Sequence, residues 1–219
     1  MELPFTPAEF FDVFRRYNQA VWPVQLIWIG AACAALLLVR NGSRRGTRSM
    51  LLVLSALWLW IALVYHAWFF RQINPAATIF AALFVGQAAL LFVHGLRAVE
   101  RIRPTLTWAG VAGWLAVVYG LIVYPLLGAA LGHRYPASPT FGLPCPTTLF
   151  TLGVLLWMRP VRLRLFVIPL IWTALGTVAA LELGVHEDLG LAVAALMSMA
   201  VLMKRRHSVA EPGHRSVGA

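Results

Sequence analysis

The sequence predicts an all-α integral membrane protein, a bundle of seven transmembrane helices preceded by a short amphipathic helix. Three observations lead to this prediction. The 219-residue chain is 60% hydrophobic and only 12% charged, which is far more apolar than an ordinary soluble domain. Its apolar residues form seven long uninterrupted runs, which favour helices because a helix in lipid satisfies its own backbone groups. Basic residues gather in every second segment between those runs.

The first element is a short helix within residues 5–20. Thr6–Glu9 has the pattern of a capping box with proline at the first helical position, and Phe5 and Phe10 have the spacing of a hydrophobic staple. One face carries Phe10, Val13, Phe14 and Tyr17, and the other carries Asp12, Arg15, Arg16 and Gln19. The pattern is typical of a helix on the membrane surface, where it can anchor and cover the bundle or dock a partner.

Seven spans follow, at residues 22–39, 50–70, 75–96, 106–131, 145–158, 165–183 and 188–203. About 20 apolar residues cross a bilayer, so the fifth and seventh spans are short. The fourth span is long, and we expect it to tilt or to kink at Tyr124–Pro125. Residues 1–20 are thus an interfacial helix, 21–204 a transmembrane domain, and 205–219 a disordered cytoplasmic tail.

The arginines and the lysine predict the orientation. Fourteen of the 18 basic residues follow the first, third, fifth and seventh spans, and four lie on the other side. Cytoplasmic loops carry the basic excess, so the N-terminus is outside and the C-terminus is cytoplasmic. The net charge of +10 is therefore an orientation signal, with possible binding to anionic lipid headgroups, and does not indicate nucleic-acid binding.

Polar residues near the outer ends of the spans predict an outward-facing pocket, because polar groups inside a membrane are costly. Pro144–Thr148 places two prolines around a cysteine, and its helix amides could point into the bundle. The candidate substrate-binding residues are His66, Asn74, Gln87, Cys145, Thr147, Thr148 and Glu182. Simpler interpretations stay open: His66 as an interfacial histidine bonded to a carbonyl, and Gln87 as an interhelical hydrogen bond.

A divalent metal is an alternative cofactor for this side of the membrane. Imidazole and carboxylate ligands suit zinc, copper or iron, and Glu182 and His186 are four residues apart. The candidate ligands are His66, Glu182, His186 and Asp188. The competing interpretation makes His133, His186 and Glu187 solvated loop residues and makes Asp188 a helix cap.

Two cofactors of seven-helix proteins are disfavoured. Retinal needs a lysine in the last span, whereas the chain's one lysine, Lys204, lies at the cytoplasmic end. His66 and His94 are expected near opposite faces of the membrane, which makes them a poor axial pair for haem, and His94 is expected to be isolated. Membrane zinc hydrolases of the ceramidase and adiponectin-receptor type need histidines in the last span, which has none.

Four short motifs carry a resemblance to a family. They are Tyr17-Asn18 with Trp22-Pro23, Tyr65-His66 with Ile73-Asn74, Pro144–Gly153, and His186–Asp188. Their order resembles a family of small bacterial multi-pass membrane proteins of unknown function, over nearly the whole chain. The resemblance implies a bacterial protein of the inner membrane and implies no substrate.

Three functions remain open from the sequence. A small-solute permease or channel-like protein would use the outward pocket, and the acidic outer side favours a cation or a basic or polar solute. An accessory or assembly subunit would have no chemistry of its own. A metal-dependent membrane enzyme would use the metal to activate water. A homo-oligomer or a partner membrane subunit could complete the walls of a pocket.

Overall fold

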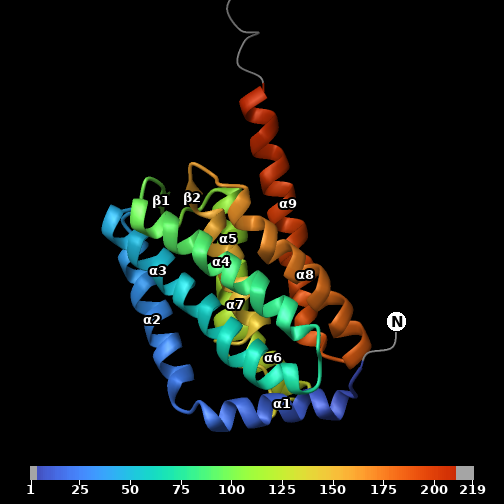
Figure 1. Ribbon diagram of the computed structural model, residues 1–219. Coiled ribbons are helices and arrows are strands. Elements are labelled where there is room, and N and C mark those ends of the chain that lie inside the picture. The colour runs from blue at the N-terminus through green and yellow to red at the C-terminus, as the bar shows by residue number, and fades with distance from the viewer. Residues whose placement is uncertain (1–3, 211–219) are drawn as a thin grey trace, which may run out of the picture.

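The computed structural model describes residues 4–210, which are almost entirely helical (Figure 1). The α-helices are α1 Pro7–Ala20, α2 Val24–Val39, α3 Arg44–Trp60, α4 Ala77–Arg97, α5 Trp108–Val118, α6 Tyr124–Ala130, α7 Pro144–Leu156, α8 Arg164–Leu183 and α9 Leu189–Ala210. Two π-helical segments continue them, η1 Ile61–Phe69 after α3 and η3 Tyr119–Val123 between α5 and α6. The short elements are η2 Phe70–Gln72, η4 His186–Asp188, and the antiparallel strands β1 Arg101–Ile102 and β2 Met158–Arg159.

Five of the expected spans coincide with helices long and apolar enough to cross a membrane. These are Arg44–Gln72, Ala77–Arg97, Trp108–Ala130, Arg164–Leu183 and His186–Arg205. The first expected span, α2, has 16 residues and follows α1 across an 82° bend, and the pair counts as a sixth span when taken together. The fifth, α7, has 13 residues. The described chain therefore has five or six helices of spanning length, where the sequence predicted seven.

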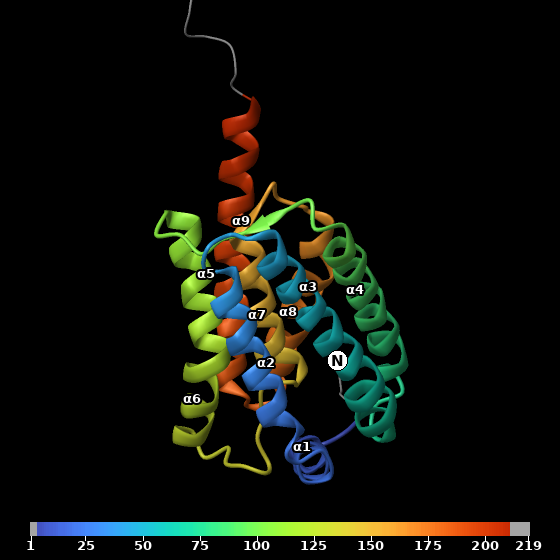
Figure 2. The same cartoon turned by 90° about the vertical axis from the view of Figure 1, so that its left-hand side faces the viewer.

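The predicted amphipathic helix is confirmed as α1. The Thr6 hydroxyl accepts from the Glu9 amide at 3.3 Å and the Thr6 amide donates to the Glu9 carboxylate at 2.8 Å, which completes the capping box. Phe5 stacks on Phe10 at 5.8 Å between ring centroids, as the staple requires. The expected apolar face is buried, so α1 lies across one end of the bundle (Figures 1 and 2).

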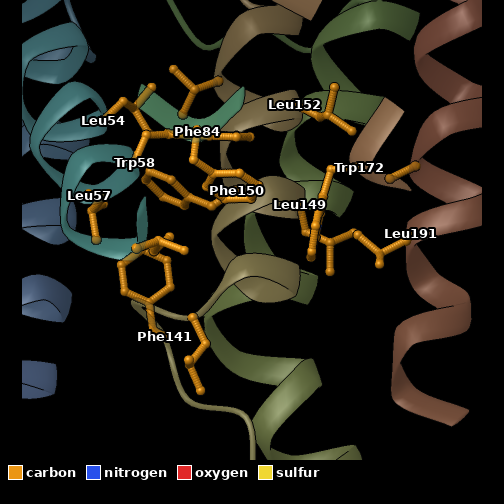
Figure 3. Close-up of a cluster of buried hydrophobic side chains, with 14 of the residues drawn as sticks. Leu54, Leu57, Trp58, Phe84, Phe141, Leu149, Phe150, Leu152, Trp172 and Leu191 are labelled. Carbon is orange, nitrogen blue, oxygen red and sulfur yellow. The ribbon is translucent and has the colours of Figure 1, made fainter. Parts of the chain in front are cut away.

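The short helix α7 is the centre of the bundle. It contacts α3, α5, α8, α9 and η3, and every residue from Pro146 to Leu156 is buried. A helix that is apolar all round belongs in an interior, which explains why its weak amphipathic pattern did not reveal its position. Figure 3 shows Leu149, Phe150 and Leu152 of α7 between Trp58 on one side and Trp172 and Leu191 on the other.

Two glycines allow α5 to approach α7. A Cβ at Gly153 would lie 2.6 Å from the Gly113 carbonyl oxygen, and a Cβ at Gly113 would lie 2.8 Å from the Gly153 carbonyl oxygen. Real side chains do not fit at such distances, so both positions need glycine for backbone contact. This contact brings η3 against the N-terminal part of α7, where a Cβ at Gly120 would lie 2.7 Å from the Pro146 carbonyl oxygen.

The two ends of the bundle differ in charge. Residues 40–48, 97–103 and 159–164 lie at the end that carries β1 and β2, and the C-terminal part of α9 leaves the bundle on the same side (Figure 1). Arg44 Nε donates to the Ala98 carbonyl oxygen at 3.1 Å, and Arg205 Nη2 donates to that of Leu156 at 2.9 Å. We call this the basic end, and the opposite one the α1 end. Helix α9 continues beyond the bundle to Ala210, so residues 205–210 are helical where a disordered tail was expected; residues 211–219 lie outside the described residues.

Candidate functional site

Six polar side chains meet at the α1 end of the bundle, and we call them the α1-end cluster. They come from η3, α6, the loop 131–143, α7 and η4. The members are Tyr119, Tyr124, His133, Cys145, Glu187 and Asp188. Two of them are consecutive carboxylic acids at the start of the last membrane helix, which makes this the most acidic buried place in the described chain.

The turn between α8 and α9 directs both acids inward. Gly184 adopts a left-handed conformation with φ 72°, and the Val185 amide donates to the Ala180 carbonyl oxygen at 3.1 Å. Glycine suits this conformation because it has no Cβ. The single 3₁₀ turn that follows leaves His186 exposed and buries Glu187 and Asp188.

Glu187 is fully buried and paired with a histidine. His133 Nδ1 lies 2.8 Å from one carboxylate oxygen and 3.1 Å from the other, so Nδ1 carries hydrogen and donates to Glu187. The Tyr119 hydroxyl donates to the Glu187 carbonyl oxygen at 2.8 Å. A Cβ at Gly128 would lie 3.0 Å from the carboxylate, so α6 approaches closely. The expectation that His133 and Glu187 are solvated loop residues is therefore wrong for Glu187.

Asp188 is 4% exposed and has neutral partners. The Tyr124 hydroxyl donates to its carboxyl group, and the Cys145 thiol is a second side-chain partner. Tyr124 is itself 1% exposed. The sequence marked Tyr124 only as a kink, whereas the structure gives it a polar contact across the bundle with the start of the last helix.

Further polar side chains continue this cluster toward the centre of the bundle. A Cβ at Gly176 would lie 3.8 Å from Cys145 Sγ and 3.9 Å from Trp172 Nε1, so the indole nitrogen faces the thiol. Thr148 follows Cys145 by three residues on the same face of α7. The Trp172 indole is a side-chain partner of the Cys145 thiol, whereas Thr148 Oγ1 has no hydrogen-bond partner within the described residues. A buried unpartnered hydroxyl costs about 1–3 kcal/mol, so this position suits a polar guest or a bridging water.

His66 is fully buried in η1, and both of its ring nitrogens lack a partner among the described residues. The sequence-based interpretation of an interfacial histidine bonded to a carbonyl is therefore wrong. Aromatic rings surround the imidazole, with centroid distances of 5.2 Å to Tyr65, 6.1 Å to Phe70, 5.8 Å to Phe80, 4.6 Å to Phe84 and 5.2 Å to Trp172. Through Trp172, this aromatic shell borders the α1-end cluster.

The remaining predicted pocket residues lie elsewhere. Asn74 Oδ1 accepts from the Ala76 amide at 3.0 Å in the turn before α4. Gln87 Nε2 donates to the Leu165 carbonyl oxygen at 3.0 Å, which is the interhelical bond that was the simpler interpretation. Thr147 Oγ1 accepts from the Gly142 amide at 3.2 Å. Glu182 is exposed on α8.

The four candidate metal ligands are not brought together. His66 is enclosed by aromatic rings, Asp188 is in the α1-end cluster, and Glu182 and His186 are exposed. Gly184 ends α8 between the last two, so they do not share a helical face. Across the part of the chain that the structure describes, no three His, Cys, Asp or Glu side chains are placed to hold a metal ion.

A cover formed by α1 and the loop 131–143 lies over the cluster. The Asn18 amide donates to the carbonyl oxygens of Pro136 at 2.7 Å and Ser138 at 2.8 Å, and its oxygen accepts from the Thr140 hydroxyl at 2.8 Å. Phe11 of α1 packs on His133 at 4.5 Å between ring centroids. The cluster is therefore closed toward the α1 end in this conformation.

A third buried carboxyl group, Glu100, lies at the basic end. It accepts from Arg162 Nε at 2.7 Å and pairs with His94 Nδ1 at 3.0 Å, while Arg164 Nε donates to His94 Nε2 at 3.0 Å. The expectation that His94 is isolated is therefore wrong. Burial acts to raise the pKa of Glu100, but hydrogen bonds from its own backbone amide, Arg162 and His94 outweigh it and lower the pKa.

A model of the family of unknown function DUF6064 matches residues 7–211. The chain belongs to that family. The match spans nearly all of the described residues and confirms the resemblance to an uncharacterised family. No curated protein and no solved structure matches the chain.

Three residues of this DUF6064 member were not predicted to belong to the site, namely Tyr119, Tyr124 and Trp172. Aromatic residues in a transmembrane run look like ordinary lipid or core contacts, so nothing in their spacing marks them. A usable signal was the pair Glu187-Asp188 directly before an apolar run, because two adjacent acids at a membrane helix start need partners if they are buried.

Proposed function

We propose that the protein is a small-solute permease or channel-like protein of the bacterial inner membrane that takes a cation or a basic or polar solute at the α1-end cluster. The observation that carries the proposal is the burial of Glu187 and Asp188 within an apolar bundle, close to the unpartnered hydroxyl of Thr148. Ionisable residues at membrane depth are expensive and mark solute or ion pathways. Their negative charge favours a cationic guest.

The proposed orientation places the cluster on the outer side of the membrane. Within the described residues, the basic end carries 13 of the 18 Lys and Arg residues of the sequence, and the positive-inside rule assigns that end to the cytoplasm. The arginines there suit anionic headgroups of the inner leaflet. A solute would then enter from the periplasmic side, beneath the cover of α1 and the loop 131–143.

Binding would proceed by replacing water around the solute with protein groups. A cation would contact the Asp188 carboxylate, with the Tyr124 hydroxyl and the Cys145 sulfur as further ligands at its sides. Thr148 would then offer a hydroxyl toward the centre of the bundle. The metal-dependent enzyme gains no such support, because its four candidate ligands are dispersed.

The test is uptake into proteoliposomes that contain the purified protein. The probes are potassium, methylammonium and choline, which are cations of increasing size, with glycerol as a neutral solute. We expect at least one cation to enter faster than in empty vesicles, and we expect Asp188→Ala to reduce that uptake more than tenfold. Glu182→Gln removes an exposed acid from α8 and should leave uptake unchanged.

Equal permeability of protein-containing and empty vesicles for all four probes would contradict the permease proposal. Retained uptake in a folded Asp188→Ala variant would move the pathway away from the α1-end cluster. A partner membrane protein that co-purifies in fixed ratio, together with no uptake, would favour the accessory role instead.

A further inference from the structure

We infer that Asp188 holds an exchangeable proton at neutral pH and that a cationic solute entering the α1-end cluster displaces it. The protonation stands on the structure of the cluster alone. The exchange of the proton for a cation rests on the proposed function, and the transport would then be a proton–cation antiport. The argument for the proton has three steps: burial, charge balance and hydrogen bonding.

Burial sets the cost of ionisation. Asp188 is 4% exposed and its neighbour Glu187 is fully buried, so both carboxyl groups are removed from water. An ionised carboxylate inside a protein costs several kcal/mol unless a cation and hydrogen bonds compensate it. Two adjacent ionised carboxylates would add mutual repulsion to that cost.

Charge balance assigns the proton to Asp188 rather than to Glu187. His133 donates to both carboxylate oxygens of Glu187, so Glu187 has a cationic partner whenever the imidazole is protonated. The contacts of Asp188 are a hydroxyl and a thiol, both neutral. The sequence has no Lys or Arg from 165 to 203, and Arg134, the basic residue nearest in the loop, is exposed.

The titratable groups that face Asp188 come from each neighbouring element. They are Tyr65 of η1, Tyr119 of η3, Tyr124 of α6, His133 of the loop, Cys145 of α7 and Glu187 of η4. The tyrosines and the cysteine are neutral at physiological pH, and the one histidine among these groups is bonded to Glu187. None of the groups that face Asp188 is therefore a cation in contact with its carboxyl group.

Hydrogen bonding does not replace the missing cation. The Tyr124 hydroxyl and the Cys145 thiol both donate to Asp188, and two neutral donors compensate an ionised carboxylate less than a charged partner does. A carboxylic acid can still accept both of these bonds, and its own proton can be given to an entering polar group.

The exchange step conserves charge. A protonated Asp188 meets a cation from the outer side, the O–H bond of the carboxyl breaks, and the proton passes to water on that side. The carboxylate and the cation then form a neutral pair in the cluster. On release of the cation, a proton returns to Asp188, so one proton moves for each unit charge of solute.

The chain permits a direct test without a variant at the site. It contains only two aspartates, Asp12 and Asp188, so protein grown with aspartate labelled with ¹³C at the side-chain carboxyl has two carboxyl signals to resolve. Asp12 is half-exposed and lies between Arg15 at 3.0 Å and Arg16 at 3.1 Å, which makes it an internal reference for an ionised carboxylate. The Asp12→Asn variant identifies which signal belongs to Asp188.

At neutral pH and without solute, we expect one signal at the chemical shift of a carboxylate and one at that of a carboxylic acid. Addition of saturating methylammonium should move the second signal toward the carboxylate value, while the Asp12 signal stays fixed. Two carboxylate signals before addition would overturn the protonation of Asp188, even if the vesicles transport cations.

The outcomes separate this inference from the proposed function. A protonated Asp188 that does not respond to any cation, in a protein that shows no uptake, would leave the proton in place and end the permease proposal. Uptake of a cation with no change in the Asp188 signal would overturn the exchange, because the solute would then pass without displacing the proton.

Discussion

Two buried carboxyl sites lie at opposite ends of the same bundle and differ in what surrounds them. Glu100, at the basic end, is 2% exposed and accepts from an arginine and a histidine that is itself bonded to a second arginine. Asp188, at the α1 end, is 4% exposed and contacts a tyrosine and a cysteine. Equal burial therefore has opposite consequences, because guanidinium groups stabilise an ionised carboxylate and neutral groups do not.

The difference separates a structural site from a functional one. Glu100 holds β1, α4 and the start of α8 together, since it joins Arg162 to His94, and its lowered pKa keeps it ionised. A group that is always charged and always paired has little to exchange. Asp188 has partners that tolerate both of its protonation states, which is what a site that binds and releases a cation requires.

The largest loss of stability is expected from a variant that breaks the ion pair at the basic end. Arg162→Gln leaves the Glu100 carboxylate buried with the His94 imidazole as its remaining side-chain partner, and removal of one partner from a buried pair is strongly destabilising. Because the Arg162 side chain is 38% exposed, we expect a loss of about 2 kcal/mol, below the range of fully buried pairs. Denaturant unfolding in detergent micelles measures it.

The matched control is Arg40→Gln, which removes an exposed arginine at the same end of the bundle. Surface substitutions of this kind change stability by about 0.5 kcal/mol or less. If both variants lose the same amount, the Glu100–Arg162 pair is an ordinary surface contact and the contrast between the two ends fails.

The second effect is a pH dependence that belongs to Glu100. Its folded pKa is lowered below the ordinary value of 4.5, so the unfolded chain binds more protons near that pH and the stabilisation is present above it. The stabilisation is lost as pH falls through the folded pKa. We therefore expect Glu100→Gln to be less stable than the wild type at neutral pH, with the gap in unfolding temperature narrowing below pH 4.5.

The comparison uses the difference in unfolding temperature between the wild type and Glu100→Gln. Both proteins share the other carboxyl groups that titrate in acid, so the contributions of those groups cancel. A gap that stays constant from neutral pH into acid would mean that Glu100 gives no ionised contribution to stability. A gap that widens in acid would mean that its folded pKa is raised, which reverses the assignment.

The smallest effect is expected at the α1 end. Asp188→Asn replaces a protonated carboxyl with a neutral group of the same shape, so the free energy of unfolding at neutral pH should change by less than about 1 kcal/mol. A loss of several kcal/mol, comparable with that of a broken buried ion pair, would show that the wild-type residue is an ionised carboxylate with a charged partner.

Much of the fold follows from the sequence because hydropathy decides it. Five spans, the capping box and the buried face of α1 are read from local patterns that packing does not override. The spans at α2 and α7 are less secure because α2 and α7 are short, and hydropathy does not distinguish a buried central helix from one that faces lipid.

The site is harder to predict because its partners are distant in sequence. Tyr124 and Asp188 are 64 residues apart in the sequence. No short motif spans such a distance, so spacing alone does not connect them. His94 and Glu100 are close along the chain, but their pairing depends on a left-handed turn at Ala98, with φ 42°. No local sequence pattern predicts this turn, because alanine rarely adopts a left-handed conformation. The sequence suggested a solvated loop residue at Glu187 and a helix cap at Asp188, because the inward direction of their turn depends on Gly184.

The most direct measurement of the contrast is a pH titration of side-chain carboxyl ¹³C signals in one sample of protein labelled at aspartate and glutamate. Glu100→Gln and the aspartate variants assign the two resonances of interest. We expect Glu100 to be a carboxylate at neutral pH and to remain one below pH 4.5, while Asp188 is a carboxylic acid at neutral pH. A neutral-pH spectrum in which Asp188 and Glu100 are both carboxylates would contradict the proposed division between a fixed and an exchangeable site.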